Sequence, residues 1–339
     1  MKILITGGAG FIGSELTEYL INNVKNIKLT LIDNLSRSDK SRIKHLNNKI
    51  KFIKSDVKNI NSLKIKKFNW IIHTSAIAPL PDNQIDHGKS ITENIAQCGS
   101  IVDFCIKTGT KNILFFSSAA IYENTNTKNL IEDKCNRPKL MYPLSKYLAE
   151  KYFRSITESY NLNVVSLRLA NIYGRNQDYN RKQPPFIGYL IKNVLLNNKL
   201  TLFAKGNYKR DYLFIDDLSN LITKIIKNKK FSRKNKIFEY LNVGSGKRYS
   251  VPDFIKLIEK IFNKKILLTW GKKTDYWKKY DSLYNSKIKF HSSLIEKEVK
   301  KKVSLNLKKV HFAYKWKAEY DINRGLIECI NHAKKILRL

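Results

Sequence analysis

The chain has 339 residues with a formal net charge of +36, and 42% of its residues are hydrophobic. This length allows one large α/β unit or two lobes around a substantial core, and no apolar run reaches the roughly 18 residues of a membrane span. The excess charge is mostly lysine spread along the whole chain, whereas nucleic-acid-binding proteins concentrate charge and favour arginine. We therefore expect neither a nucleic acid nor a membrane among its partners.

The cysteines and the first residues indicate the compartment. Cys98, Cys105, Cys135 and Cys329 show no CxxC or Cys/His ligand spacing, so we expect reduced thiols and no metal site. The sequence opens on a strand-like run and shows no signal-peptide pattern. Together these features predict a cytoplasmic protein.

The first residues predict a strand, a glycine-rich turn and a helix in that order. Residues 3–5 are a short apolar run, and residues 12–21 have helical periodicity. Between them the glycines follow a GxxGxxG spacing. Gly7 can form the tight turn, Gly10 lets the backbone approach a pyrophosphate, and Gly13 lets the helix pack close to the strand. Because the N–H groups of the helix N-terminus point at the phosphates, this pattern predicts a dinucleotide site.

A second apolar run, residues 27–32, ends in Asp33. A carboxylate at the tip of the second strand can accept both hydroxyls of the adenosine ribose, and it would repel a 2′-phosphate. The sequence therefore favours NAD over NADP, although Arg37 could soften that preference. An alternative is that Asp33 only caps a loop.

Over the first two-thirds of the chain, strand-like runs alternate with helical segments. Strands separated by helices predict an α/β protein with a doubly wound parallel Rossmann sheet. The expected strands are residues 3–5, 29–32, 51–53, 70–73, 113–117 and 164–169, and the expected helices include residues 93–108 and 144–160.

After residue 171 the pattern loosens into loops and lysine-rich stretches, and strand-like runs return at 212–215 and 238–243. We expect a smaller C-terminal α/β substrate lobe built from several separate segments. The predicted division gives an NAD-binding Rossmann domain at residues 1–170, with part of about 208–243 returning to it, and a substrate-binding lobe at 171–207 and 244–339.

Three polar residues downstream are suited to acid–base chemistry beside the cofactor. Ser118 follows the strand 113–117, and ligands of doubly wound sheets bind beyond the carboxyl ends of the strands. Tyr142 and Lys146 can project from one helical face, and Pro143 suits the first position of that helix. A lysine ammonium, together with the positive nicotinamide ring of NAD⁺, would lower the pKa of Tyr142 from about 10 toward 7. We expect Ser118 to bind the same sugar oxygen.

Tyr-x-x-x-Lys alone is common by chance, but here it follows the glycine loop, Asp33 and Ser118 in order. The chain closely resembles the extended short-chain dehydrogenase/reductase family, in particular its NAD-dependent nucleotide-sugar epimerases and dehydratases of the UDP-glucose 4-epimerase type. The resemblance covers nearly the full length. The matching segments are residues 6–13, 33–36, 55–57, 73–76, 117–122, 142–146, 167–174, 209–212 and 242–246.

The resemblance implies NAD as cofactor, a nucleotide-diphosphate sugar as substrate, a role in polysaccharide biosynthesis and a homodimer. It assigns Tyr142 as the acid–base residue, Lys146 as its tuning partner and Ser118 as the second hydroxyl on the reacting oxygen. Asn171 and Arg210 would bind the substrate diphosphate, while an ion pair of Arg210 with Asp211 or Asp216 is the alternative. The implied cofactor-binding residues are Gly7, Gly10, Phe11, Ile12, Gly13, Asp33, Asn34, Ser36, Asp56, Val57, Ser75, Ala76, Tyr142 and Lys146.

The departures from the family pattern concern the substrate. Glu123 follows Tyr122 where glycine is usual, and Ala78 stands where some epimerases have a lysine. Residues 271–302, with Trp277, Tyr280 and Tyr284, contain no arginine for a second phosphate contact, so Lys272 or Lys273 would have to replace it.

Several activities stay open at this point. A 4,6-dehydratase would carry a Thr-Asp-Glu triplet where Ser118, Ala119 and Ala120 stand, so we favour a C4 epimerase of a UDP-sugar. A keto-sugar reductase would use the same Tyr and Lys. A non-catalytic, dinucleotide-sensing or RNA-associated protein is the alternative from another class.

Overall fold

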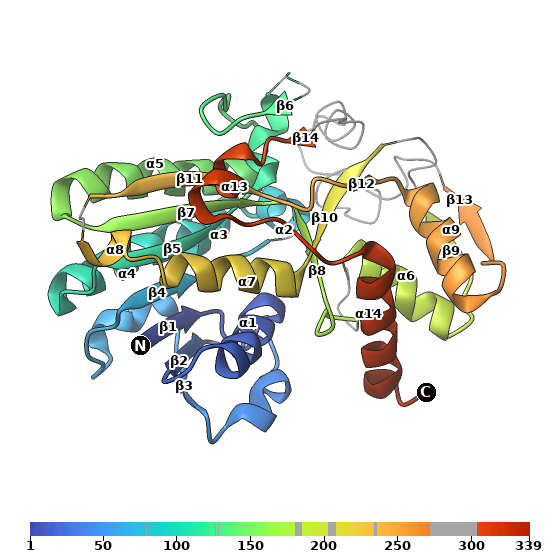
Figure 1. Ribbon diagram of the computed structural model, residues 1–339, viewed down its shortest axis with the longest axis horizontal. Helices are drawn as coiled ribbons and strands as arrows, with labels where there is room; N and C mark the ends of the chain where they lie inside the picture. Colours follow the sequence, from blue (N-terminus) through green and yellow to red (C-terminus); the bar gives the residue numbers. More distant parts are fainter. Residues whose placement is uncertain are drawn as a thin grey trace.

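The computed structural model describes residues 1–78, 80–125, 127, 129–179, 185–202, 208–233, 236–271 and 304–339. These residues form a central parallel sheet with helices on both faces and a smaller group of helices and short strands beside it (Figure 1). No helix in these ranges is long and apolar enough to cross a membrane.

The central sheet has seven strands in the spatial order β11-β7-β5-β4-β1-β2-β3, and every neighbouring pair is parallel. This is the doubly wound topology that the alternating pattern predicts, because each crossover between parallel strands needs a connection over the sheet. The strands are β1 (Lys2–Thr6), β2 (Lys28–Asp33), β3 (Ile50–Lys54), β4 (Trp70–His73), β5 (Asn112–Ser118), β7 (Asn163–Leu169) and β11 (Phe238–Val243).

Alternate side chains of the strands supply two separate cores. In β1, Ile3 and Ile5 belong to one core cluster and Leu4 to the other, as the two-residue period of a strand requires. The helices α1 (Phe11–Asn23) and α7 (Ile215–Ile226) cover the first face. The helices α4 (Ala96–Thr108) and α5 (Met141–Tyr160) cover the second face.

Two helix predictions need correction. The expected helix 93–108 is two helices, α3 (His87–Asn94) and α4, which meet at Ile95. The side chain of Asn94 accepts a hydrogen bond from the Ile77 backbone N–H (2.8 Å) and donates one to Ser145 Oγ (3.1 Å). These contacts fix the end of α3 against neighbouring segments, which explains why the helix is interrupted there.

Helix α5 begins before Pro143, not at it. Leu140 is the N-cap, so Pro143 is the third residue of the helix, and the first intrahelical bond runs from the Leu144 N–H to the Leu140 carbonyl (2.9 Å). Proline is tolerated because the N–H groups of the first turn have no intrahelical partner. Tyr142 is therefore inside the first turn.

The smaller group contains the helices α6 (Phe186–Leu195), α9 (Val251–Phe262) and α14 (Ile322–Leu337). A three-stranded sheet of β8 (Asn171–Tyr173), β10 (Arg210–Phe214) and β12 (Arg248–Tyr249) joins it to the main sheet. The remaining short strands pair as β9 (Leu200–Leu202) with β13 (Leu268–Trp270) and β6 (Asn129–Leu130) with β14 (Ser304–Leu305). The short helices are η1 (Lys40–Leu46), η2 (Val57–Ser62), η3 (Ala119–Asn124), α2 (Leu80–Ile85), α8 (Lys230–Arg233) and α13 (Lys308–Tyr314).

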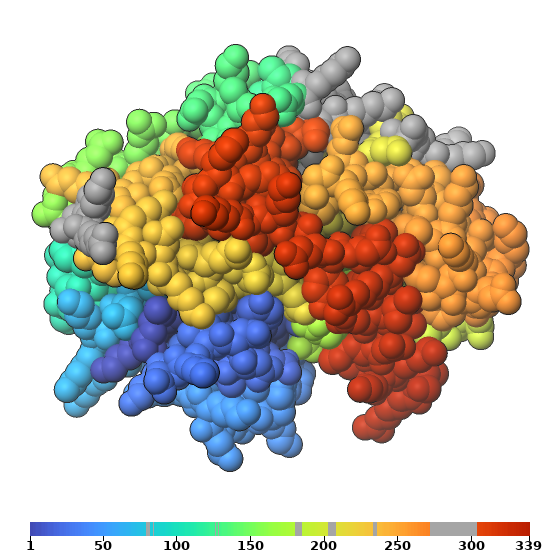
Figure 2. Space-filling view, viewed as in Figure 1, coloured from blue at the N-terminus to red at the C-terminus, as the bar shows by residue number. Residues whose placement is uncertain are grey.

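The C-terminal segment, residues 304–339, contacts both the elements of the central sheet and the smaller group of helices. Helix α13 packs on β11 and α7, and α14 packs on α6 and α9. Figure 2 shows this red segment running across one face of the molecule, from the yellow α7 to the orange residues of α9. The predicted division into a Rossmann domain (residues 1–170 with part of 208–243) and a substrate-binding lobe (171–207 and 244–339) stays a prediction.

Candidate active site

The glycine loop has the geometry of a phosphate-binding turn. Gly7 has φ +67°, and its N–H donates to the Ile32 carbonyl (2.8 Å). A Cβ on Gly13 would collide with the Gly7 carbonyl oxygen, so only glycine lets α1 start this close to the loop. The N-cap Gly10 offers no side-chain cap, and the first turn of α1 carries no acid. The N–H groups of Phe11 and Ile12 are thus suited to a pyrophosphate.

Asp33 lies buried at the tip of β2 and contacts the glycine loop. Its Oδ2 accepts a hydrogen bond from the Ala9 N–H (3.0 Å), and its Oδ1 accepts bonds from the Leu35 N–H (2.9 Å) and Ser38 Oγ (2.7 Å). The carboxylate therefore does join two loops, as the capping alternative supposes. Its Oδ2 accepts only one hydrogen bond and keeps a second lone pair for a ribose hydroxyl. Arg37 pairs with Asp82 (2.6 Å).

The predicted adenine-side residues meet beyond the ends of β2 and β3. Asn34 Nδ2 donates to Asp56 Oδ2 (3.1 Å), and the Ser36 N–H donates to Asn34 Oδ1 (3.0 Å). Asp56 also caps η2, with its Oδ1 accepting from the Lys58 N–H (2.8 Å), and Val57 is buried behind it. The loops after the two strands are therefore held together by these side chains.

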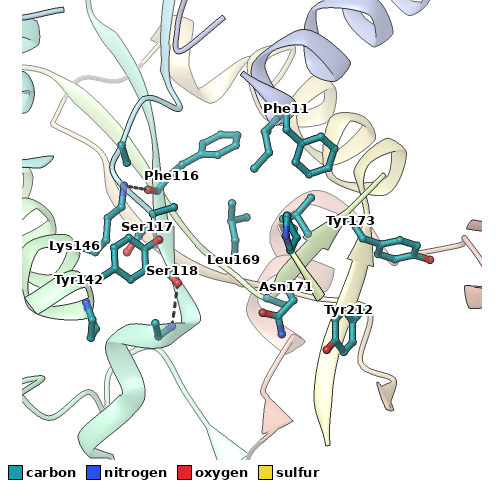
Figure 3. A pocket seen from close by; sticks show the side chains of 18 of the residues that line it. Phe11, Phe116, Ser117, Ser118, Tyr142, Lys146, Leu169, Asn171, Tyr173 and Tyr212 are labelled. Atoms are coloured by element: carbon teal, nitrogen blue, oxygen red, sulfur yellow. Dashed lines mark hydrogen bonds between the residues drawn. The ribbon is translucent and has the colours of Figure 1, made fainter. Parts of the chain in front are cut away.

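A cleft of about 510 Å³ lies between the sheet and the smaller group of elements. Figure 3 shows Ser118, Tyr142 and Lys146 on one side of it and Asn171, Tyr173 and Tyr212 on the other, with Phe11 nearby. The predicted site residues that line this cleft are Phe11, Ile12, Ala76, Ser118, Tyr142, Lys146 and Asn171. The Ser75 hydroxyl is directed elsewhere and donates to Gln97 Oε1 (2.6 Å).

Lys146 is a buried cation at the inner wall of the cleft. Only 3% of the residue is exposed, and its Nζ donates to the Phe116 carbonyl (2.8 Å). Burial disfavours the charged form and lowers the pKa of Lys146 to about 8. The side chain is thus fixed, and its ammonium loses its proton at a lower pH than that of an exposed lysine.

Tyr142 shows that the protein alone does not prepare a phenolate. Burial raises the pKa of the Tyr142 hydroxyl, and hydrogen bonding with Ser118 opposes this effect only partly. The expectation that Lys146 and the nicotinamide ring together lower the pKa of Tyr142 concerns the NAD-bound enzyme and stays a prediction. The Lys146 ammonium keeps its charge while it is bound to the Phe116 carbonyl, and the bound cofactor would add a second positive charge.

The buried ammonium gives a testable link between stability and pH. An unfolded lysine titrates near 10.5, so between pH 8 and 10.5 the unfolded chain binds more protons than the folded one, and stability should rise with pH. We expect the free energy of unfolding of the wild type, relative to K146M, to increase across this window by an amount on the order of 3 kcal/mol. Denaturation of nucleotide-free protein at several pH values measures it.

The exposed Lys151 of the same helix provides the control for this experiment, because its ammonium stays in water in both states. The free energy of unfolding of K151M should change with pH in the same way as that of the wild type between pH 8 and 10.5. A constant difference between wild type and K146M over this window would show that the Lys146 ammonium is not desolvated.

The opposite side of the cleft carries the expected diphosphate residues. Asn171 lines the cleft, and its Nδ2 donates to the Asp211 carbonyl (3.1 Å). Arg210 does not line the cleft, but it lies two residues before Tyr212, so both share one face of β10. The acids of the ion-pair alternative have other partners: Asp211 accepts from Ser245 and Gly246, and Asp216 pairs with Arg175.

Two buried charged residues lie near the cleft, and the sequence pointed to Glu123 only as a departure from the family pattern and gave Arg168 no role. Glu123 lines the cleft itself, and Arg168 forms a buried ion pair with Glu150 beneath it. The charged residue Arg168 inside the mostly apolar strand run 164–169 could have indicated this buried ion pair, because buried charges require partners. The predicted contributors Lys272, Lys273, Trp277, Tyr280 and Tyr284 lie outside the described residues.

Comparison with known proteins places this site in a family. Residues 3–244 match the NAD dependent epimerase/dehydratase family. The chain is 27% identical to a putative UDP-glucose 4-epimerase of Methanocaldococcus jannaschii, over 98% of both chains.

Two solved structures share the fold over nearly the whole chain. One is a UDP-glucose 4-epimerase of Thermotoga maritima with UDP-glucose, at 23% identity, TM-score 0.80 and coverage of 99% of this chain and 100% of that one. The other is a UDP-glucuronic acid 4-epimerase of Bacillus cereus with UDP-glucuronic acid and NAD, at 22% identity, TM-score 0.80 and the same coverage. They confirm the predicted Rossmann fold. The chain therefore belongs to the NAD dependent epimerase/dehydratase family and is an NAD-dependent enzyme.

Proposed function

We propose that this enzyme is a UDP-sugar 4-epimerase, which inverts the hydroxyl at C4 of the sugar. The observation that carries the proposal is the cleft that brings Ser118, Tyr142 and Lys146 together beside the N-terminus of α1. The similarity to the M. jannaschii protein over 98% of both chains supports the choice of a UDP-sugar.

The residues of the chain would hold the cofactor in an extended position. The glycine loop, Gly7 to Gly13, would bind the pyrophosphate, and Asp33 the adenosine ribose. Asn34, Ser36, Asp56 and Val57 would surround the adenine, and Ser75 and Ala76 the middle of the cofactor. Lys146 would bind the nicotinamide ribose. When bound, NAD supplies an acceptor for the C4 hydride and the donor that returns it.

Tyr142 would move the proton that accompanies the hydride. As a phenolate, its oxygen would take the proton of the C4 hydroxyl during oxidation, and the resulting hydroxyl would return that proton during reduction. Ser118 Oγ would hold the same sugar oxygen. In the free protein this Oγ accepts from the Ala120 N–H (3.1 Å), which fixes its position at the start of η3.

The diphosphate and the assembly complete the proposal. Asn171 and Arg210 would bind the UDP diphosphate, which places the sugar near Tyr142.

The apolar side chains of Ile106, Leu148 and Tyr160 on α4 and α5 are exposed by 47%, 39% and 49%, which supports pairing of these helices in a homodimer. We further propose a cytoplasmic enzyme that supplies sugars for polysaccharide biosynthesis.

Purified protein incubated with UDP-, GDP-, CDP- and dTDP-sugars, without added reductant, tests the activity. Formation of a C4 epimer of a UDP-sugar with no net change in NADH is the expected result. A product lighter by one water would identify a dehydratase instead. Dependence on added NADH or NADPH would identify a keto-sugar reductase, and NAD binding without any turnover a non-catalytic protein.

A further inference from the structure

Glu123 is an acid in the wall of the cleft. It belongs to η3, the short helix that Ser118 caps, and it lines the cleft together with Ser118 and Tyr142. Only 5% of the residue is exposed. A carboxylate at this depth is costly unless its oxygens have partners.

One oxygen of Glu123 is fixed by the start of α5, and the other is not. Oε2 accepts hydrogen bonds from the backbone N–H groups of Lys139 (2.8 Å) and Leu140 (3.2 Å). Among the residues that the structure describes, none donates a hydrogen bond or an ion pair to Oε1. Oε1 is therefore the atom of this side chain that a ligand in the cleft would meet.

The described part of the cleft wall contains one positive charge, that of Lys146. The proposed function assigns this ammonium to the nicotinamide ribose, and none of the described contacts joins it to Glu123. The other described wall residues are uncharged. A hydroxyl group can donate to Oε1, whereas a sugar carboxylate beside Oε1 would meet a like charge.

We propose that Glu123 is a specificity-determining residue that selects UDP-sugars with a neutral hexose and rejects UDP-uronic acids. The inference rests on the proposed function, since it places the sugar of a UDP-sugar beside Ser118 and Tyr142. It concerns a distinction that the shared fold leaves open, because structures of this fold hold either UDP-glucose or UDP-glucuronic acid.

The charge of Glu123 can be removed with little change in shape. In E123Q the amide oxygen can accept the hydrogen bonds from the Lys139 and Leu140 N–H groups. The amide nitrogen then takes the place of Oε1 and presents a hydrogen-bond donor to the cleft. In wild type we expect kcat/KM for UDP-glucose to exceed that for UDP-glucuronic acid by about 100-fold. E123Q should reduce this ratio by about tenfold or more, chiefly through better use of UDP-glucuronic acid.

Two further variants separate charge from loop structure. E123G removes the carboxylate altogether and should also reduce the ratio. E132Q makes the same chemical change at a nearby buried acid that does not line the cleft and accepts from the Asn242 N–H (2.9 Å), so its ratio should equal that of the wild type. Unchanged ratios in both Glu123 variants, or equal use of the two sugars by the wild type, would overturn the inference.

Failure of the proposed function has a different signature. If no epimer forms from any UDP-sugar, the epimerase assignment fails. Calorimetric affinities of UDP-glucose and UDP-glucuronic acid for NAD-loaded wild type and E123Q then test Glu123 alone. If the wild type binds UDP-glucuronic acid more weakly than UDP-glucose, and this difference in affinity is smaller in E123Q, the role of Glu123 is supported. Equal affinities of the wild type for the two sugars reject it.

Discussion

Replacement of Tyr142 by phenylalanine is expected to lower turnover by about 10²–10⁴-fold, because it removes the only atom proposed to move the C4 proton. NAD binding should be almost unchanged, since the glycine loop and Asp33 are untouched. The ring of Tyr142 keeps its place in the first turn of α5, so the cleft retains its shape. Initial rates of epimer formation and titration of NAD measure the two quantities.

The position of Tyr142 makes this loss larger than that of a simple hydrogen bond. Burial raises the pKa of its hydroxyl in the free protein, so little phenolate exists near neutral pH. The positive charge of the bound cofactor is needed to shift the proton equilibrium. In the proposed mechanism, Tyr142 therefore acts as a base only when the cofactor is bound.

Tyr147 provides the matched control, because it lies on the same helix but does not line the cleft. Y147F should retain wild-type turnover. An equal rate in Y142F and Y147F would show that Tyr142 moves no proton in the reaction, and the enzymatic role assigned to it would be wrong.

The glycine loop could be predicted from sequence because its chemistry is local. Gly7 has a left-handed backbone conformation, and Gly13 packs against the Gly7 carbonyl in the same short loop, so the residues involved are close in sequence. The paired strands could be predicted for a similar reason, since short apolar runs between helices determine a parallel sheet. The start of α5 could not, because Pro143 is compatible with any of the first positions of a helix.

The remaining features of the site depend on contacts between distant segments. Glu123 and Glu132 are both acids in a polar stretch of sequence, yet one lines the cleft and the other binds the backbone of β11. Nothing in their local sequence separates these roles. The pKa of Tyr142 likewise follows from burial and from where the Lys146 ammonium is bound, which are tertiary properties.

A buried network below the cleft holds the Ser118 loop to the sheet. Arg168 in β7 binds Glu150 of α5 through two parallel hydrogen bonds, from Nη2 to Oε2 (2.8 Å) and from Nε to Oε1 (3.0 Å). Its Nη1 also donates to the Tyr122 hydroxyl (2.8 Å) and to the Glu132 carbonyl (2.7 Å). The Tyr122 hydroxyl in turn donates to Asn242 Oδ1 (2.8 Å). Residues from four separate segments therefore depend on one guanidinium group.

Replacement of Arg168 by methionine should lower the free energy of unfolding by about 3–5 kcal/mol, because it leaves the Glu150 carboxylate buried without its partner. Both side chains are nearly inaccessible, at 3% and 1% exposure, so water cannot replace the lost contacts. We expect the thermal midpoint to fall by roughly 5–10 °C. Turnover should fall as well, since Tyr122 belongs to η3, the short helix that Ser118 caps.

The exposed pair Arg154–Glu158 on α5 is the control, with side chains 57% and 72% exposed. R154M should change stability by no more than about 0.5 kcal/mol, because water solvates the remaining carboxylate. Combining R168M with E150L removes both buried charges, and the double variant should be more stable than R168M alone. If R168M were as stable as R154M, the carboxylate of Glu150 would have to find another partner, and the loop after Ser118 would not depend on this network.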